Sequence, residues 1–200
     1  MVIKNNLFIS LSFMMGLVVI FSNYLVQFPV KYYGLQEVLT YGALSYPVTF
    51  LITDLANRAF GKSVARKVVY VGFAIGVFLT LIISTNFSDL ISIRIAIGSG
   101  AAFLIAQNSD IQIFDKLRAN KIWFVAPLIS STCGSIIDTF IFFSISFYNT
   151  GISWVSLALG DLVVKLLISI IMLVPFKILL SRIKDISSSS FEKNTYKNIS

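Results

Sequence analysis

Residues 153–180, SWVSLALGDLVVKLLISIIMLVPFKILL, form a stretch of 28 residues in which only Asp161, Lys165 and Lys177 are charged. A helix of about 20 residues is long enough to cover the roughly 30 Å of hydrocarbon in a bilayer. A helix on the surface of a soluble protein would instead carry a polar face with helical periodicity. The stretch therefore predicts a membrane-spanning helix.

Five further apolar stretches precede this one, and together they predict an all-α protein. The six predicted spans cover residues 7–27, 36–54, 68–84, 91–111, 122–147 and 153–180. The composition agrees, because 56% of the 200 residues are hydrophobic and the mean hydropathy is +0.86. We predict one integral membrane bundle of six transmembrane helices over residues 1–186 and a polar, disordered cytoplasmic tail over residues 187–200.

The basic residues follow the alternation that is typical of a multi-pass membrane protein. With the amino terminus inside, every Lys and Arg except Lys31, Arg94 and Lys165 falls in an inner segment. The positive-inside rule thus predicts an inner-membrane protein with both termini in the cytoplasm. The net charge of +7 then reflects topology and anionic lipid headgroups, and predicts no nucleic-acid partner.

The residue types present argue against an enzyme. The chain has no His, so the commonest metal ligand and general base are absent. Its one cysteine, Cys133, cannot form an intrachain disulfide or a thiolate metal site. We therefore expect no catalytic residues, no metal site and no cofactor, and we rank an intramembrane enzyme and a ligand-free scaffold below a transporter.

Charged residues within the predicted spans are the candidate functional residues, because a charge in hydrocarbon costs about 3 kcal/mol or more. Asp54 and Asp110 lie near the inner ends of the second and fourth spans, and Asp138 lies deep in the fifth. Asp138 has no opposite charge nearby in the sequence, so it needs a partner from another helix, a proton or a ligand. Arg94 is our candidate partner, because both residues lie toward the outer half.

Asp161 and Lys165 are four residues apart, so they share a helix face and can pair. A pair of this kind either lowers the cost of insertion or takes part in gating, and we assign Arg94, Asp161 and Lys165 to charge pairs or gates. Pro47 and Pro127 can interrupt the backbone ladders of the second and fifth spans. Two halves of three spans have opposite orientations, which allows a 3 + 3 inverted repeat.

The segment 46–66, YPVTFLITDLANRAFGKSVAR, resembles the signature of the queuosine precursor transporter family, once called the vitamin uptake transporter family. Arg94 followed by AQNSD at 106–110 supports the resemblance, as do ST at 131–132 with IDT at 137–139, and Lys165 with Pro175. The blocks together cover residues 40–180. One position departs from the family, which often has Glu where this chain has Arg58.

The resemblance implies six helices and the import of a 7-deazaguanine, such as 7-cyano- or 7-aminomethyl-7-deazaguanine, or queuine. A carboxylate can accept hydrogen bonds from both the ring N–H and the exocyclic amine of a guanine-like edge. The candidate substrate-binding residues are Asp54, Asn57, Gln107, Asp110 and Asp138. The candidates for stacking on the base are Tyr46, Phe50, Trp123 and Phe140.

A second function stays open at this point. Six-helix proteins of this size also act as substrate-capture subunits that need an energising ATPase partner. The partners expected from the sequence are thus a purine-like small molecule and the lipid bilayer, with an ATPase under this alternative, and the sequence leaves a homo-oligomer open.

Overall fold

The computed structural model describes residues 2–25, 28–32, 39–83 and 89–197, and the side chains within these ranges except those of 2–5, 80, 81, 83 and 182–197. Over this part of the chain the backbone forms helices and an isolated β-bridge between Pro29 and Thr40, without any strand. The predicted all-α class is confirmed.

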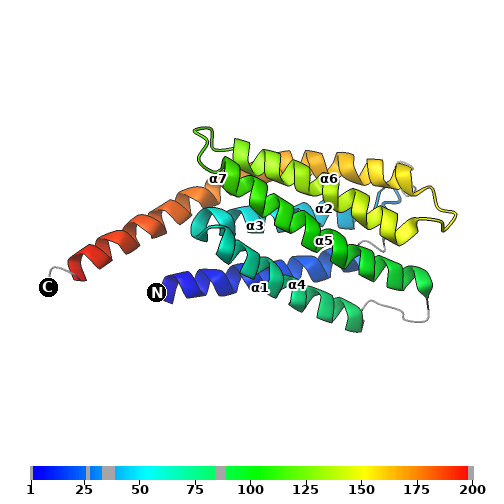
Figure 1. Cartoon of the computed structure of the whole chain (residues 1–200), viewed down its shortest axis with the longest axis horizontal. Helices are drawn as coiled ribbons and strands as arrows, with labels where there is room; N and C mark the ends of the chain where they lie inside the picture. The colour runs from blue at the N-terminus through cyan, green and yellow to red at the C-terminus, as the bar shows by residue number, and fades with distance from the viewer. Residues whose placement is uncertain (1, 26–27, 33–38, 84–88, 198–200) are drawn as a thin grey trace.

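The helices run along the long axis of the molecule, and Figure 1 shows α1 beside α4 and α5 beside α6. Their bounds are α1 Val2–Leu25, α2 Gly42–Ser45, α3 Pro47–Phe60, α4 Lys62–Ile83, α5 Leu90–Leu117, α6 Val125–Phe147 and α7 Trp154–Lys197. Asp89 begins α5 as its N-cap, because its carboxylate accepts hydrogen bonds from the backbone N–H groups of Ile91 and Ser92.

Four helices among the described residues are long and apolar enough to cross a membrane. They are Asn6–Leu25, Leu90–Leu117, Val125–Phe147 and Trp154–Ser181. The other two predicted spans, 36–54 and 68–84, correspond to α2 with α3 and to α4. Residues 26–27, 36–38 and 84 of the predicted spans lie outside the described residues.

The two prolines singled out in the sequence have different effects. Pro47 is the first residue of α3 and follows Tyr46, which separates α3 from the short α2, so the second predicted span is interrupted there. Pro127 lies in the first turn of α6, which continues unbroken to Phe147. Because the first N–H groups of a helix have no intrahelical acceptor, Pro127 removes no helical bond. Of the two interruptions that the sequence allowed, α6 therefore shows none at Pro127.

The main apolar core lies between α1, α3, α4 and α5. Met15 and Val19 of α1 are buried there with Val68 of α4 and Phe103 of α5. The contact of α1 with α4 depends on small residues, because a Cβ added at Gly72 would overlap the side chain of Met15. Helices in a membrane have no hydrophobic driving force for association, so close packing at small residues of this kind stabilises the contact.

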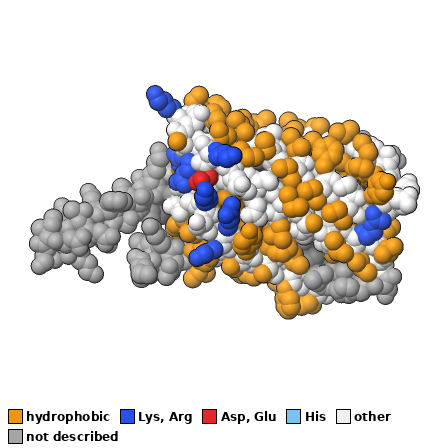
Figure 2. Space-filling model, in the orientation of Figure 1, with side chains coloured by type: hydrophobic (Ala, Val, Ile, Leu, Met, Phe, Trp, Pro, Cys, Tyr) orange, Lys and Arg blue, Asp and Glu red, His pale blue; other side chains and the backbone are white. Residues whose placement is uncertain are grey.

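The surface is apolar along most of its length. Large side chains such as Phe13, Phe21 and Val174 are 58–61% exposed, and Figure 2 shows hydrophobic side chains over most of the visible face. The basic side chains on that face gather mostly at one end (Figure 2). At this end Asp115 pairs with Lys62 and Arg118 at 3.4 Å in each case. An apolar girdle with a basic end fits a bilayer environment.

Helix α7 reaches beyond the predicted membrane domain. The polar composition predicts disorder from residue 187, but α7 includes residues 187–197. In Figure 1 the last part of α7 projects away from the other helices. The domain boundary at residue 186 stays a prediction.

Candidate functional site

The first of two buried polar groups, which we call the Lys165 cluster, consists of Asp138 and Thr139 of α6 with Asp161 and Lys165 of α7. Lys165 Nζ lies 2.8 Å from Asp138 Oδ2 and 2.6 Å from Asp161 Oδ2. Thr139 Oγ1 donates to Asp161 Oδ2 at 2.8 Å and accepts from Lys165 Nζ at 3.2 Å. All four side chains are buried, so one ammonium group holds two carboxylates away from solvent.

The pairing of Asp161 with Lys165 confirms the prediction from their spacing, and the partner of Asp138 comes from another helix as expected. The predicted identity of that partner, Arg94, is wrong. Arg94 Nε donates to the carbonyl of Ile145 at 3.0 Å, and Nη2 donates to the carbonyl of Tyr148 at 2.7 Å. Arg94 therefore holds the end of α6, whose last carbonyls lack helical donors.

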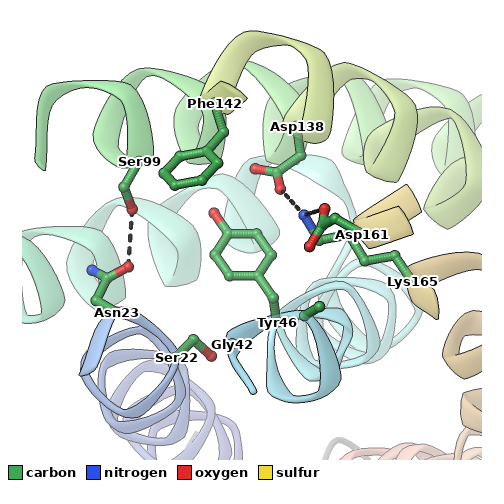
Figure 3. A pocket seen from close by; sticks show the side chains of 10 residues that line it. Ser22, Asn23, Gly42, Tyr46, Ser99, Asp138, Phe142, Asp161 and Lys165 are labelled. Atoms are coloured by element: carbon green, nitrogen blue, oxygen red, sulfur yellow. Dashed lines mark hydrogen bonds and ion pairs between the residues drawn. The ribbon is translucent and has the colours of Figure 1, made fainter. Parts of the chain in front are cut away.

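A cavity of about 30 Å³ adjoins the Lys165 cluster. Asp138, Asp161 and Lys165 line one side, and Figure 3 shows Tyr46 and Phe142 beside them, with the hydrogen-bonded pair Asn23 and Ser99 opposite. Tyr46 lies close enough to Asp138 for its hydroxyl to interact with the carboxylate. The second oxygen of Asp138, Oδ1, is buried and has no hydrogen bond of good geometry within the described structure.

Tyr46 is placed by the break between α2 and α3. Its carbonyl accepts from the backbone N–H of Thr49 at 3.0 Å and from Thr49 Oγ1 at 2.7 Å. These bonds fix the turn before Pro47. The ring then lies below Lys165 Nζ, 5.1 Å from its centroid, which is within cation–π range. The short α2 thus presents an aromatic side chain to the charged group on α7.

The second buried group, which we call the Asp54 cluster, joins α3, α5 and α6. Its members are Thr49, Thr53, Asp54, Asn57, Gln107, Asp110, Ser130 and Ser131, all buried. Thr53 Oγ1 donates to Gln107 Oε1, and Gln107 Nε2 donates to Thr49 Oγ1 at 2.8 Å. Asn57 Nδ2 donates to the carbonyl of Ile111 at 3.0 Å. These bonds fix the contact of α3 with α5.

The two carboxyl groups of this cluster lie against each other. Asp54 accepts from Ser130 Oγ at 3.2 Å and from Ser131 Oγ at 3.3 Å. Asp110 is fully buried beside Asp54, and neither of its oxygens has a hydrogen bond of good geometry among the described residues. The Asp54 cluster therefore contains two adjacent acids without a basic residue, in contrast to the Lys165 cluster.

Phe50 and Gly134 lie between the two clusters along α3 and α6. Ser131 and Asp138 are seven residues apart on α6, which is about 10 Å along the helix. Phe50 fills the space at Gly134, since an added Cβ there would lie 2.5 Å from Phe50 Cε1. Four of the five predicted substrate-binding residues thus come together, and Asp138 lies in a separate cluster on the other side of Phe50.

The four aromatic candidates also have different surroundings. Tyr46 lines the cavity, and Phe50 is buried against Gly134. Phe140 is 42% exposed and does not line the cavity. Trp123 lies under Lys177 Nζ, 5.2 Å from its ring centroid, away from either cluster.

Several residues of these clusters were not identified from the sequence as candidates. Thr49 and Thr53 are two of them, and they recur with the candidate Asn57 every four residues on α3, a spacing that could have revealed a polar helix face. Ser99 and Phe142 have no such signal, because their place at the cavity depends on how α5 and α6 pack. The same holds for Ser22 and Asn23 on α1.

An all-helical chain with an apolar girdle and buried ionised groups is a multi-pass membrane protein with the features of a transporter. Residues 40–180 match the family model described as "Putative vitamin uptake transporter". The chain belongs to this family of membrane transporters.

Individual relatives agree with the family match. The chain is 37% identical to a "Probable queuosine precursor transporter" of Haemophilus influenzae, over 86% of this chain and 85% of the relative. It is 34% identical to the "Queuosine precursor transporter" of Escherichia coli, over 84% and 86% of the two chains. A Bacillus subtilis protein with the "Probable" form of that name is 26% identical over 79% of this chain and 78% of its own length.

No solved structure gave a significant match. The relatives carry the names of transporters and not of enzymes. The comparisons give no support to the alternative of a capture subunit in an ATPase-energised system.

Proposed function

We propose that this chain imports a queuosine precursor, a 7-deazaguanine base, across the cytoplasmic membrane, and that the base binds beside Asp138. The observation that carries this proposal is Asp138 at the cavity, whose buried Oδ1 has no hydrogen bond of good geometry within the described structure, in a chain whose relatives are named queuosine precursor transporters. A buried acceptor without a donor is costly unless a ligand supplies one.

The chemistry of the Lys165 cluster suits such a ligand. Two carboxylates and one ammonium group leave one negative charge at the cavity. The ring N–H and exocyclic amine of a guanine-like edge, or the ammonium of an aminomethyl substituent, can donate to Asp138. Charge-assisted bonds of this kind are about twice as strong as neutral ones. Tyr46 and Phe142 provide aromatic surfaces against which a flat base can stack.

The cavity must enlarge for the base to bind. Its volume of about 30 Å³ is enough for about two water molecules and not for a two-ring base. The conformation therefore corresponds to a closed state in this proposal. The short α2 ends just before Tyr46 and packs on α1, α3 and α7 only through four residues. We assign the opening movement to α2 and Tyr46.

The proposed topology places the two polar clusters at different depths in the membrane. Six spans, with α2–α3 and α4 added to the four long apolar helices, bring both termini to the cytoplasmic side, where Lys62 and Arg118 also lie. The Asp54 cluster then lies in the inner half of the membrane and the Lys165 cluster in the outer half. An inverted 3 + 3 repeat is compatible with this topology, and superposition of the two halves would test it.

Uptake by cells tests the proposal. The chain is expressed in bacterial cells that lack their own importer and cannot synthesise the precursor. These cells receive labelled 7-cyano- or 7-aminomethyl-7-deazaguanine. We expect the wild-type chain to give label in the cell and queuosine in tRNA, and Asp138→Asn to give neither. Asp115→Asn is the matched control, because Asp115 forms its ion pairs at the basic end, away from both clusters. Equal uptake by cells with and without the wild-type chain would refute the function.

A further inference from the structure

We infer that Asp54 and Asp110 form a proton-binding pair that couples import to the proton gradient, an inference that rests on the proposed transport function. The sequence analysis assigns both residues to the substrate and names a proton only among the groups that could compensate Asp138. The geometry reverses these roles, because Asp138 is paired with Lys165, whereas Asp54 and Asp110 lie beside each other without an ion pair in the described structure.

The first step in the argument is burial. Asp54 is 1% exposed and Asp110 is fully buried, and their carboxyl groups are adjacent at the contact of α3 with α5. Two negative charges in this position would repel each other strongly in a medium of low polarity. Two adjacent carboxyl groups relieve this repulsion by sharing one proton, so that they titrate as a pair.

The second step is the lack of a compensating cation. Neither carboxyl group forms an ion pair within the described structure, and the hydroxyls of Ser130 and Ser131 donate to Asp54. The basic residues of the surrounding helices interact with other groups. Arg58 donates to the carbonyl of Arg118, and Lys62 and Arg118 pair with Asp115. Lys177 lies over the ring of Trp123, and Lys165 pairs with Asp138 and Asp161. Arg66 and Lys67 of α4 form no ion pair with either carboxyl group in the described structure.

A separate observation is that buried acceptors without donors gather between these helices. The amide oxygen of Asn57, one turn after Asp54, is buried and has no hydrogen-bond partner in the described structure. Both oxygens of Asp110 share this condition. The α3–α5 contact therefore holds buried acceptors in excess of donors, and each unmatched acceptor is costly. A bound proton supplies one of the missing donors.

The surroundings favour a proton over a metal cation. The hydroxyl groups of Ser130 and Ser131 donate to Asp54, and a metal cation would need about six oxygen ligands arranged around a central space. The cavity that reaches Asp54 and Ser131 has a volume of only about 10 Å³. A proton needs neither additional ligands nor space.

The position of the pair suggests how it acts on transport. One acid belongs to α3 and the other to α5, so their shared proton stabilises the contact of these helices. Release of the proton toward the cytoplasm leaves two negative charges that push the helices apart. Their separation would loosen Phe50 from Gly134 and open a path from the cavity to the cytoplasmic side.

Liposomes that contain only this protein and an entrapped pH-sensitive dye test the inference. We choose 7-cyano-7-deazaguanine as the probe because it carries no ionised amine. With an acidic exterior, the wild-type protein should accumulate the base and acidify the interior when the base is added. For one proton per base, a gradient of about one pH unit supports about tenfold accumulation. Asp54→Asn and Asp110→Asn, inserted in the same amount as the wild type, should lose both effects, because neither variant can develop the second negative charge that separates α3 from α5.

The control and the contrary outcomes are distinct. Asp115 lies on the same helix as Asp110, and Asp115→Asn should accumulate the base and acidify the interior as the wild-type protein does. Wild-type protein that exchanges the base but neither accumulates it nor acidifies the interior would overturn the inference and leave the transport function standing. Accumulation driven by a sodium gradient alone would also overturn it. Failure of the wild-type protein to exchange the base at all would refute the proposed function itself.

Discussion

Lys165 Nζ on α7 lies 2.8 Å from Asp138 Oδ2 on α6, in a position from which solvent is almost fully excluded. The same ammonium group binds Asp161 one turn earlier on α7. One cation thus joins two helices and compensates two acids. This relationship has consequences for stability as well as for substrate binding, because removal of the cation leaves two buried carboxylates side by side.

Replacement of Lys165 by Met should destabilise the folded protein strongly. Loss of one partner from a buried ion pair typically costs about 3–5 kcal/mol, since the remaining charge is uncompensated. The double variant Lys165→Met with Asp161→Asn should be more stable than Lys165→Met alone, because only Asp138 then stays charged. Thermal unfolding of the purified protein in detergent measures both. Equal melting temperatures for wild type and Lys165→Met would contradict the geometry.

Substitution of Gly134 by Ala should disturb the contact between the two polar clusters. The added methyl group would lie 2.5 Å from the ring of Phe50, which is almost fully buried. Overpacking of this kind costs about 1–3 kcal/mol, and we expect a lower melting temperature and slower substrate exchange. Phe50→Leu in the same chain should restore both, because the smaller side chain leaves room. Lack of rescue would show that Phe50 is not the residue that the methyl group meets.

Arg94→Gln should reduce stability without removing transport. Arg94 donates two hydrogen bonds to carbonyls at the end of α6 and pairs with no carboxylate in the described structure. Hydrogen bonds that involve a charged group contribute about 1.5–3 kcal/mol. A lower melting temperature, with near-normal exchange by the protein that remains folded, is the expected result. Loss of exchange at unchanged stability would instead restore the gating role that the sequence suggests.

Reporter fusions to the carboxyl terminus test the proposed orientation. With six spans and a cytoplasmic amino terminus, a green fluorescent protein fused after Ser200 should fluoresce in bacterial cells. Alkaline phosphatase fused at the same place should be inactive, because it needs the oxidising periplasm. The opposite pattern would require an odd number of spans or an inverted insertion.

The sequence predicted the helical class well because hydrophobic length is a local property. Each long apolar run, such as 153–180, can be compared with the thickness of a bilayer without knowledge of its neighbours. The pairing of Asp161 with Lys165 was also local, since it follows from a spacing of four residues on one helix. The interruption at Tyr46 and Pro47 likewise had a signal within the chain.

Contacts between helices could not be predicted in the same way. The sequence analysis names Arg94 as the candidate partner of Asp138, because both residues are predicted to lie toward the outer half of the membrane. Depth alone does not fix which helix faces overlap, and α7 brings Lys165 to Asp138 while Arg94 reaches the end of α6. Asp138 is separated from Asp54 and Asp110 because Phe50 of α3 packs against Gly134 of α6. This contact joins two helices, so the sequence of either helix alone does not predict it.

Exchange of labelled 7-cyano-7-deazaguanine by purified protein in liposomes, compared between wild type and Asp138→Asn, tests the central claim most directly. Wild-type vesicles loaded with unlabelled base should take up external label rapidly, and the Asp138→Asn protein, with the same melting temperature and the same amount inserted, should take up little. Exchange by Asp138→Asn at the wild-type rate would contradict the claim that the base binds at the cavity beside Lys165.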